Sequence, residues 1–147
     1  MLGDLLRMLT GRAAPQDEAE AAPLALAALL VRVARADGSY DAREKVLIDR
    51  LLARRFGLGP EAAAALRSRA EALETEAPDS VRFTRALKEA VPYEERAGLV
   101  EDLWAVVLAD GRRDHEEDGF MRLAAQLLGL TDRESAEARR RVERGNR

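Results

Sequence analysis

Apolar residues recur at intervals of three and four along nearly the whole chain, and they rarely alternate with polar residues. An interval of three to four places apolar side chains on one face of an α-helix, whereas strict alternation is typical of a β-strand. Alanine, leucine, arginine and glutamate, all good helix formers, dominate the sequence. The pattern predicts an all-α protein.

Proline and glycine divide this pattern into successive helices. We expect residues 1–20 to form a short amphipathic helix over 2–9 and a linker over 11–20, and residues 21–147 to form one helical domain. In that domain, Pro23 suits the first turn of a helix that runs to about Ala36. The later helices are expected over 41–56, 60–75, 80–91, 93–109, 114–128 and from 131 onward.

The same pattern predicts which faces are buried. The helix from Pro23 is apolar almost all round, so we expect it at the centre of the core. The helix over 41–56 is expected to bury Val46, Leu47, Leu51, Leu52 and Phe56. The helix over 114–128 is expected to bury Phe120, Met121, Leu123, Leu127 and Leu128.

One motif, A-D-G-x-x-D-x-x-E, occurs twice, beginning at Ala36 and again at Ala109. The flanking helices match as well: Leu26 aligns with Leu99 and, with one residue of slippage, Gly57 aligns with Gly129. The repeat therefore covers two helix-turn-helix units.

Helix capping explains part of this motif. Asp41 suits an N-cap with Glu44 three residues later, a cap worth about 1 kcal/mol, and Asp114 and Glu117 repeat the arrangement. Capping explains Asp37 and Asp110 less well. Each lies at the C-terminal end of a predicted helix, where the helix dipole disfavours negative charge.

A bound cation would account for the crowded carboxylates. The candidate ligands are Asp37, Asp41, Glu44, Asp110, Asp114 and Glu117. An all-oxygen set suits Ca²⁺, Mg²⁺ or Mn²⁺. The spacing is not that of an EF-hand, because glycine directly follows the first acid. Three carboxylates are also too few to enclose calcium, so a complete site needs both copies, water or a partner.

Composition and charge narrow the classes of function. A net charge of −3 argues against a nucleic-acid-binding protein. The absence of cysteine excludes disulfides and thiolate chemistry, and it fits the cytoplasmic location that we expect. The longest apolar stretch, 21–31, is too short to span a bilayer, and the N-terminus does not resemble a signal peptide. We therefore expect no membrane partner, and we interpret the C-terminal arginine cluster as a solvated helix face.

Nothing in the sequence points to catalysis. It contains no phosphate-binding glycine loop, no H-E-x-x-H motif and no Ser-His-Asp order. His115, the single histidine, follows a predicted helix start, where a surface position is the simplest interpretation. We expect a protein that is not an enzyme.

The doubled motif in an all-α chain of this length resembles the TerB-like domain. That family includes tellurite-resistance TerB proteins and the N-terminal region of DjlA-type membrane co-chaperones. The matching blocks are Leu24–Leu58 and Ala97–Leu130, whereas residues 1–20 and the arginine-rich tail have no clear counterpart. Since the chain has no H-P-D motif, the resemblance does not extend to co-chaperone activity.

The resemblance implies a compact bundle of about seven or eight helices, in which two similar halves pack about a pseudo-two-fold axis. It also implies a role in stress response and an acidic site for divalent cations at the six motif positions. Two hypotheses stay open. Either the motifs bind a hard cation or a basic partner, or the protein is a metal-free scaffold for a protein partner and its motifs are only helix caps.

Overall fold

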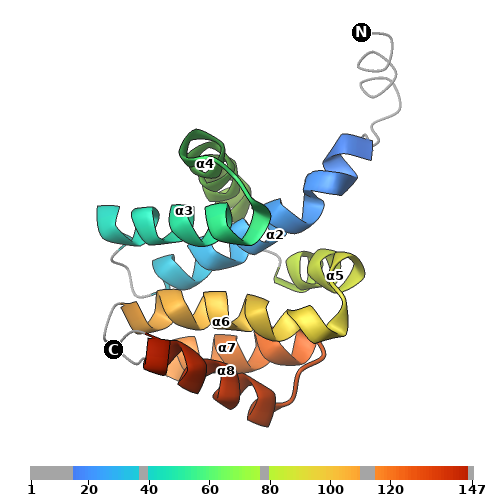
Figure 1. Ribbon diagram of the computed structural model, residues 1–147, viewed down its shortest axis with the longest axis vertical. Coiled ribbons are helices and arrows are strands. Elements are labelled where there is room, and N and C mark those ends of the chain that lie inside the picture. Colours follow the sequence, from blue (N-terminus) through green and yellow to red (C-terminus); the bar gives the residue numbers. More distant parts are fainter. Residues whose placement is uncertain (1–14, 37–39, 77–79, 110–114, 146–147) are drawn as a thin grey trace, which may run out of the picture.

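The computed structural model describes residues 15–36, 40–76, 80–109 and 115–145, and the side chains of 15–20 and 115–118 lie outside this description. Those residues form seven helices, α2 to α8, and contain no strand (Figure 1). The predicted all-α class is confirmed. The expected helix over 2–9 lies outside the described residues.

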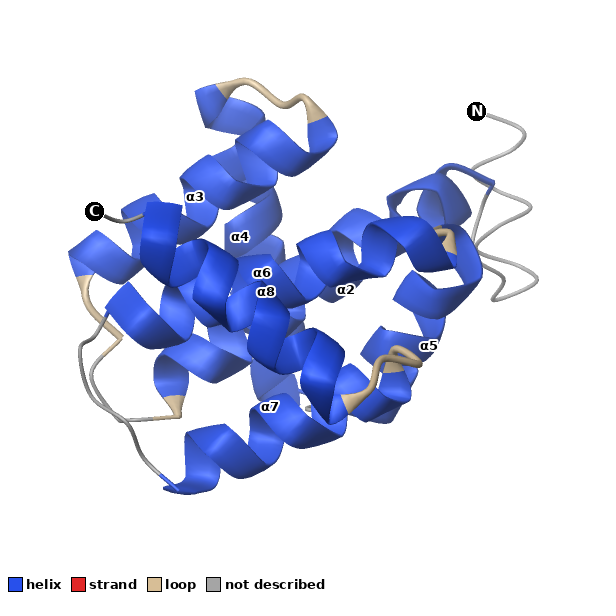
Figure 2. Ribbon diagram, turned by 60° about the horizontal axis from the view of Figure 1, so that its bottom comes forward, coloured by secondary structure: helices blue, strands red, loops and turns tan. Residues whose placement is uncertain are grey.

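Helix α2, Pro15–Arg35, is the centre of the bundle. It packs against α3, α4, α5 and α6, and every side chain from Leu26 to Val31 is fully buried. Figures 1 and 2 show it crossing the molecule between the other helices.

The start of α2 differs from the prediction. We expected a linker over 11–20 and a helix from Pro23, but the helix begins at Pro15 and contains Pro23. Pro15 occupies the first helical position, where a missing N–H costs nothing, and strong helix formers follow it. The linker prediction was therefore wrong for residues 15–20.

Helices α3, Ala42–Phe56, and α4, Pro60–Glu76, follow as expected. Gly57 ends α3 in the left-handed conformation, with φ of 65°, and the Leu58 N–H donates to the Ala53 carbonyl. Gly129 ends α7 in the same way, with φ of 84° and a bond from the Leu130 N–H to the Ala125 carbonyl. These bonds are typical of a Schellman motif, and they confirm that Gly57 and Gly129 are equivalent.

The remaining helices are α5, Ser80–Ala90, α6, Tyr93–Ala109, α7, His115–Leu127, and α8, Asp132–Gly145. A capping box starts α8 at the residue from which this helix was expected. The Glu134 N–H donates to Thr131 Oγ1 at 3.1 Å, and the Thr131 N–H donates to Glu134 Oε1 at 2.9 Å. None of the described helices has both the length and the apolar content needed to cross a bilayer.

Two buried faces differ from the prediction. In α3, Val46 is 49% exposed, and the buried face is formed by Glu44, Ile48, Leu51 and Leu52. In α7, Leu123 is 46% exposed, while Met121, Ala124, Ala125 and, just after the helix, Leu128 are buried. The buried side chains still recur at intervals of three and four, but the buried face is rotated from the predicted one.

Candidate functional site

The N-terminus of α3 contains the described side chains of the first acidic motif. Asp41 is the N-cap, in extended backbone conformation, and its Oδ1 accepts a hydrogen bond of 3.0 Å from the Glu44 N–H. Its carboxylate is about half exposed, and Arg43 is its ion-pair neighbour at 3.9 Å. The predicted capping role of Asp41 is confirmed.

Glu44 has a different environment from Asp41, although both lie in one turn. The residue is only 7% exposed, and it belongs to the buried face of α3. A capping glutamate at this position normally stays in solvent, so capping alone does not explain its burial. Burying a carboxylate is costly unless positive charge or hydrogen-bond donors compensate it.

The first residue of the second motif copy lies beside these carboxylates. Asp41 and Glu44 line a surface pocket of about 210 Å³ together with Arg43, Leu47 and Ala109. Ala109 is the last residue of α6 and the first residue of the second copy. Figure 1 shows the start of α3 and the end of α6 on the same side of the bundle. The fold thus brings together parts of two motifs that lie far apart in the sequence.

Most of the predicted ligands lie outside this description. Asp37, Asp110 and Asp114 are outside the described residues, and Glu117 lies in α7 with its side chain undescribed. His115 is the first residue of α7, and its side chain is likewise undescribed. Among the described side chains, no group of three acids or histidines could hold a metal ion. The six-residue site stays a prediction.

Sequence reasoning missed Tyr40, which occupies a variable position of the motif. Its hydroxyl donates a hydrogen bond of 2.6 Å to Glu71 Oε2 on α4. Burial and this bond to a carboxylate raise the pKa of the Tyr40 hydroxyl well above its usual value. Arg67 also donates to Glu71, at 3.0 Å, and to Asp49 on α3, at 2.6 Å. Burial acts to raise the pKa of Glu71, but the bonds from Tyr40 and Arg67 outweigh it, so this pKa is lowered.

Two cations flank the Tyr40 ring. The Arg35 guanidinium lies 5.3 Å from the ring centroid and the Lys45 ammonium lies 5.2 Å from it. Arg35 also donates to the Glu71 carbonyl, to Glu74 and to Thr75, all on α4. These contacts connect Tyr40 and the end of α2 to α4. The corresponding position of the second copy is Arg113, so the repeat itself offered no indication of this role.

A buried ion pair joins α3 to α6. Asp102 is 1% exposed, and it accepts from Arg55 Nε at 2.8 Å and from Arg55 Nη2 at 3.1 Å. Burial raises the pKa of Asp102, although Arg55 and Arg54 oppose that shift. Arg55 Nη2 also donates to the Gly98 carbonyl, and a Cβ at Gly98 would lie 2.9 Å from Arg55 Nη1. The glycine therefore provides the space that the guanidinium occupies.

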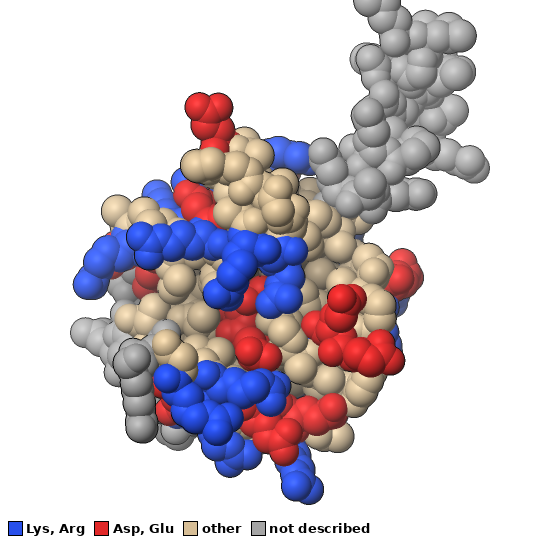
Figure 3. Space-filling view, viewed as in Figure 1, with Lys and Arg blue, Asp and Glu red and all other residues tan. Residues whose placement is uncertain are grey.

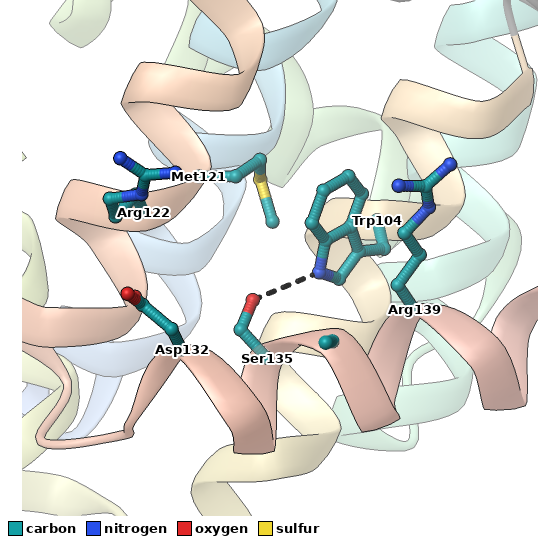
Figure 4. A pocket seen from close by; sticks show the side chains of 7 residues that line it. Trp104, Met121, Arg122, Asp132, Ser135 and Arg139 are labelled. Atoms are coloured by element: carbon teal, nitrogen blue, oxygen red, sulfur yellow. Dashed lines mark hydrogen bonds between the residues drawn. The ribbon is translucent and has the colours of Figure 1, made fainter.

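Another pocket, of about 240 Å³, lies between α6, α7 and α8 (Figure 4). The residues labelled there are Trp104, Met121, Arg122, Asp132, Ser135 and Arg139. Trp104 Nε1 donates to Ser135 Oγ at 3.1 Å, and the Arg139 guanidinium lies 5.3 Å from the indole centroid. These contacts are internal, and they attach α8 to α6.

Comparison with known proteins agrees with this fold. The family model described as tellurite resistance protein TerB matches residues 23–140. No curated protein and no solved structure matches the chain. The match covers most of the sequence, including both motif copies and every helix from the body of α2 into α8. The chain therefore belongs to the TerB family.

Proposed function

We propose that this protein is a non-catalytic stress-response module of the tellurite-resistance type, acting in the cytoplasm, whose acidic motifs bind a divalent cation. The observation that supports this proposal most is the pocket in which the acidic side chains of Asp41 and Glu44 lie beside Ala109 of the second motif copy. A cation held there would be attracted by both carboxylates.

The oxygen atoms of the described acidic side chains suit a hard cation as ligands. Asp41 Oδ1 accepts the cap bond, Asp41 Oδ2 lies 3.9 Å from the exposed Arg43 guanidinium and can act as a metal ligand, and Glu44 adds its carboxylate. Oxygen donors of this kind suit Ca²⁺, Mg²⁺ or Mn²⁺ better than softer metals. In this proposal Asp37, Asp110, Asp114 and Glu117 complete the set, since two residues alone cannot satisfy such an ion.

Calorimetric titration with Ca²⁺, Mg²⁺ and Mn²⁺ tests the proposal. Asp41→Asn is the most informative variant, because asparagine caps a helix as well as aspartate but has no charge. We expect wild-type protein to bind at least one ion, and Asp41→Asn, Glu44→Gln and the double variant Asp37→Asn/Asp110→Asn each to bind it more weakly. Asp132→Asn, which removes an exposed acid from the first turn of α8, is the matched control. Equal heats from wild type and all three variants, or no heat with any ion, would contradict the proposal.

The alternative is a metal-free scaffold for a protein partner, and the cap bond from the Glu44 N–H to Asp41 favours it. In that case added calcium leaves the melting temperature unchanged, whereas an ion that binds the native state must raise it. A basic protein segment could also bind in the acidic pocket. It would then bind wild-type protein in the presence of a chelator, and it would bind Glu44→Gln more weakly.

A further inference from the structure

A surface groove runs along α3, on the side that faces α6 and α8. It consists of two adjoining pockets that share Leu47. The first is formed by α3 alone and includes Ala42, Val46 and Arg50. The second, of about 300 Å³, lies between α3, α6 and α8. We call the two together the α3 groove.

Six of the side chains that line the α3 groove are apolar, and we call them the apolar strip. Its members are Ala42, Val46, Leu47, Leu51, Ala105 and Val142. Val46 is 49% exposed, and Leu47 beside it is only partly buried. Isolated apolar residues are normal on a surface, but a continuous apolar strip in a concavity is typical of a binding surface.

The groove is positively charged, unlike the chain as a whole. Among the described residues that line it are five arginines, Arg43, Arg50, Arg54, Arg55 and Arg141, and two carboxylates, Glu101 and Asp102. Figure 3 shows lysine and arginine side chains in a band that follows α3 and in a second group over α8.

Both carboxylates already have arginine partners. Asp102 pairs with Arg55 and Arg54, and Glu101 accepts from Arg141 at 3.2 Å. Arg43 and Arg54 keep 96% and 73% of their side-chain surface exposed, and Arg50 is exposed as well. These three arginines border the apolar strip and remain accessible to an anionic ligand.

We propose that the α3 groove binds an acidic amphipathic helix of a protein partner. From Ala42 to Arg55 the groove follows α3 for about 20 Å, the length of roughly 13 helical residues. Apolar residues at intervals of three and four on the partner would contact Val46, Leu47 and Leu51, as in other helix-in-groove complexes. Carboxylates beside them would face Arg43, Arg50 and Arg54, which gives charge complementarity along the same line.

The α3 groove adjoins the acidic pocket and shares Arg43 and Leu47 with it. The carboxylates of Asp41 and Glu44 would attract cations, whereas the exposed arginines of the groove would attract anionic segments. The peptide is therefore tested in a chelator and with variants at Val46 and Arg50, which do not line the acidic pocket.

The probe is a fluorescein-labelled peptide of roughly 14 residues, with leucine at every third and fourth position and glutamate at most others. Fluorescence anisotropy in a chelator is expected to show saturable binding to the full chain. Val46→Asp and Arg50→Glu should each weaken it by at least about tenfold, through the apolar strip and the charged border respectively.

The chain offers matched controls on α5. Val81 is 48% exposed, nearly the same as Val46, and Arg85 is exposed like Arg50. Val81→Asp and Arg85→Glu should leave the affinity unchanged within about twofold. All four positions are exposed, and circular dichroism checks that each variant stays folded.

Four outcomes would overturn the proposal. The first is no binding up to about 1 mM peptide, and the second is the same loss of peptide affinity in the α3 variants and the α5 variants. The other two concern the peptide: a glutamate peptide without leucine, or a peptide with lysine in place of glutamate, binds the wild-type protein as tightly as the probe does.

Vesicles containing phosphatidylserine provide a further test. If they bind the protein and displace the peptide, and Val46→Asp abolishes vesicle binding, the groove is a membrane surface and not a peptide site.

Discussion

At the scale of single residues, one turn of the first motif gives its carboxylates different environments. Asp41 lies half in solvent and caps α3, whereas Glu44 is turned into the bundle. Tyr40, just before them, is held by Glu71 and by two flanking cations. The turn is therefore fixed on both sides, by its own helix and by α4.

Replacing Asp41 separates its capping role from its charge. Asp41→Ala removes the oxygen that accepts from the Glu44 N–H, and we expect a loss of about 1 kcal/mol in the free energy of unfolding. Asp41→Asn should stay within about 0.5 kcal/mol of wild type, since asparagine is an equally good cap. Urea denaturation measures both. A larger loss in Asp41→Asn than in Asp41→Ala would contradict the capping role.

Tyr40 makes stability sensitive to alkaline pH. Burial and the bond to Glu71 raise its pKa in the folded protein, whereas in the unfolded chain the hydroxyl titrates near pH 10. The unfolded chain then loses this proton first, so the stability that Tyr40 contributes is complete below about pH 10 and falls as pH rises above it.

Tyr40→Phe provides the comparison. At pH 7 we expect the variant to be less stable by about 1–2 kcal/mol, because it lacks a hydrogen bond to a charged group. The difference from wild type should shrink between about pH 10 and 12, as the phenol of the unfolded wild type ionises. Chemical denaturation across this range measures it. Tyr93 also titrates, but its contribution cancels because it is present in both proteins. A stability difference between wild type and Tyr40→Phe that stays constant from about pH 10 to about pH 12 would contradict the role given to Tyr40.

At the scale of elements, the sequence predicted most helix ends, although not the start of α2, better than it predicted helix faces. Gly57, Gly129, Thr131 and Asp41 end or start helices as expected, because caps depend on residues within one turn. The buried face of α3 depends on which helices pack against it, and those lie far along the sequence. Val46 was therefore taken as core although it is 49% exposed, and the burial of Glu44 was not anticipated.

The ion pair between Arg55 and Asp102 fixes α3 against α6. Asp102→Asn keeps the shape but leaves the partly exposed Arg55 without its anion, so we expect a loss of about 2–3 kcal/mol. The double variant Arg55→Met/Asp102→Leu should lose less than Asp102→Asn alone, because only the well-exposed Arg54 then lacks its partner and water solvates it. Thermal unfolding of the three proteins measures this. A double variant less stable than the single one would show that the pair contributes more than charge compensation.

At the scale of the whole molecule, the repeat predicted which helix positions of the two halves are equivalent. Leu26 and Leu99, which the repeat aligns, are both buried, and so are Leu30 and Leu103, and Val33 and Val106, which stand at the same spacing in the two copies. The meeting of Asp41, Glu44 and Ala109 at one pocket was not predictable, since it depends on how α3 and α6 pack around α2. The α3 groove was not predictable from the sequence for the same reason, because the residues that line it come from three helices.

The central position of α2 has a consequence for hydrogen exchange in this protein. Because α2 packs against α3, α4, α5 and α6, no neighbouring helix can leave without uncovering apolar surface on it. The amide hydrogens of its middle turns should therefore exchange with solvent only when the whole chain opens. A ligand that binds the folded protein at the acidic pocket or the α3 groove stabilises it against this global unfolding. Such a ligand should therefore slow hydrogen exchange in the middle of α2, which it does not contact.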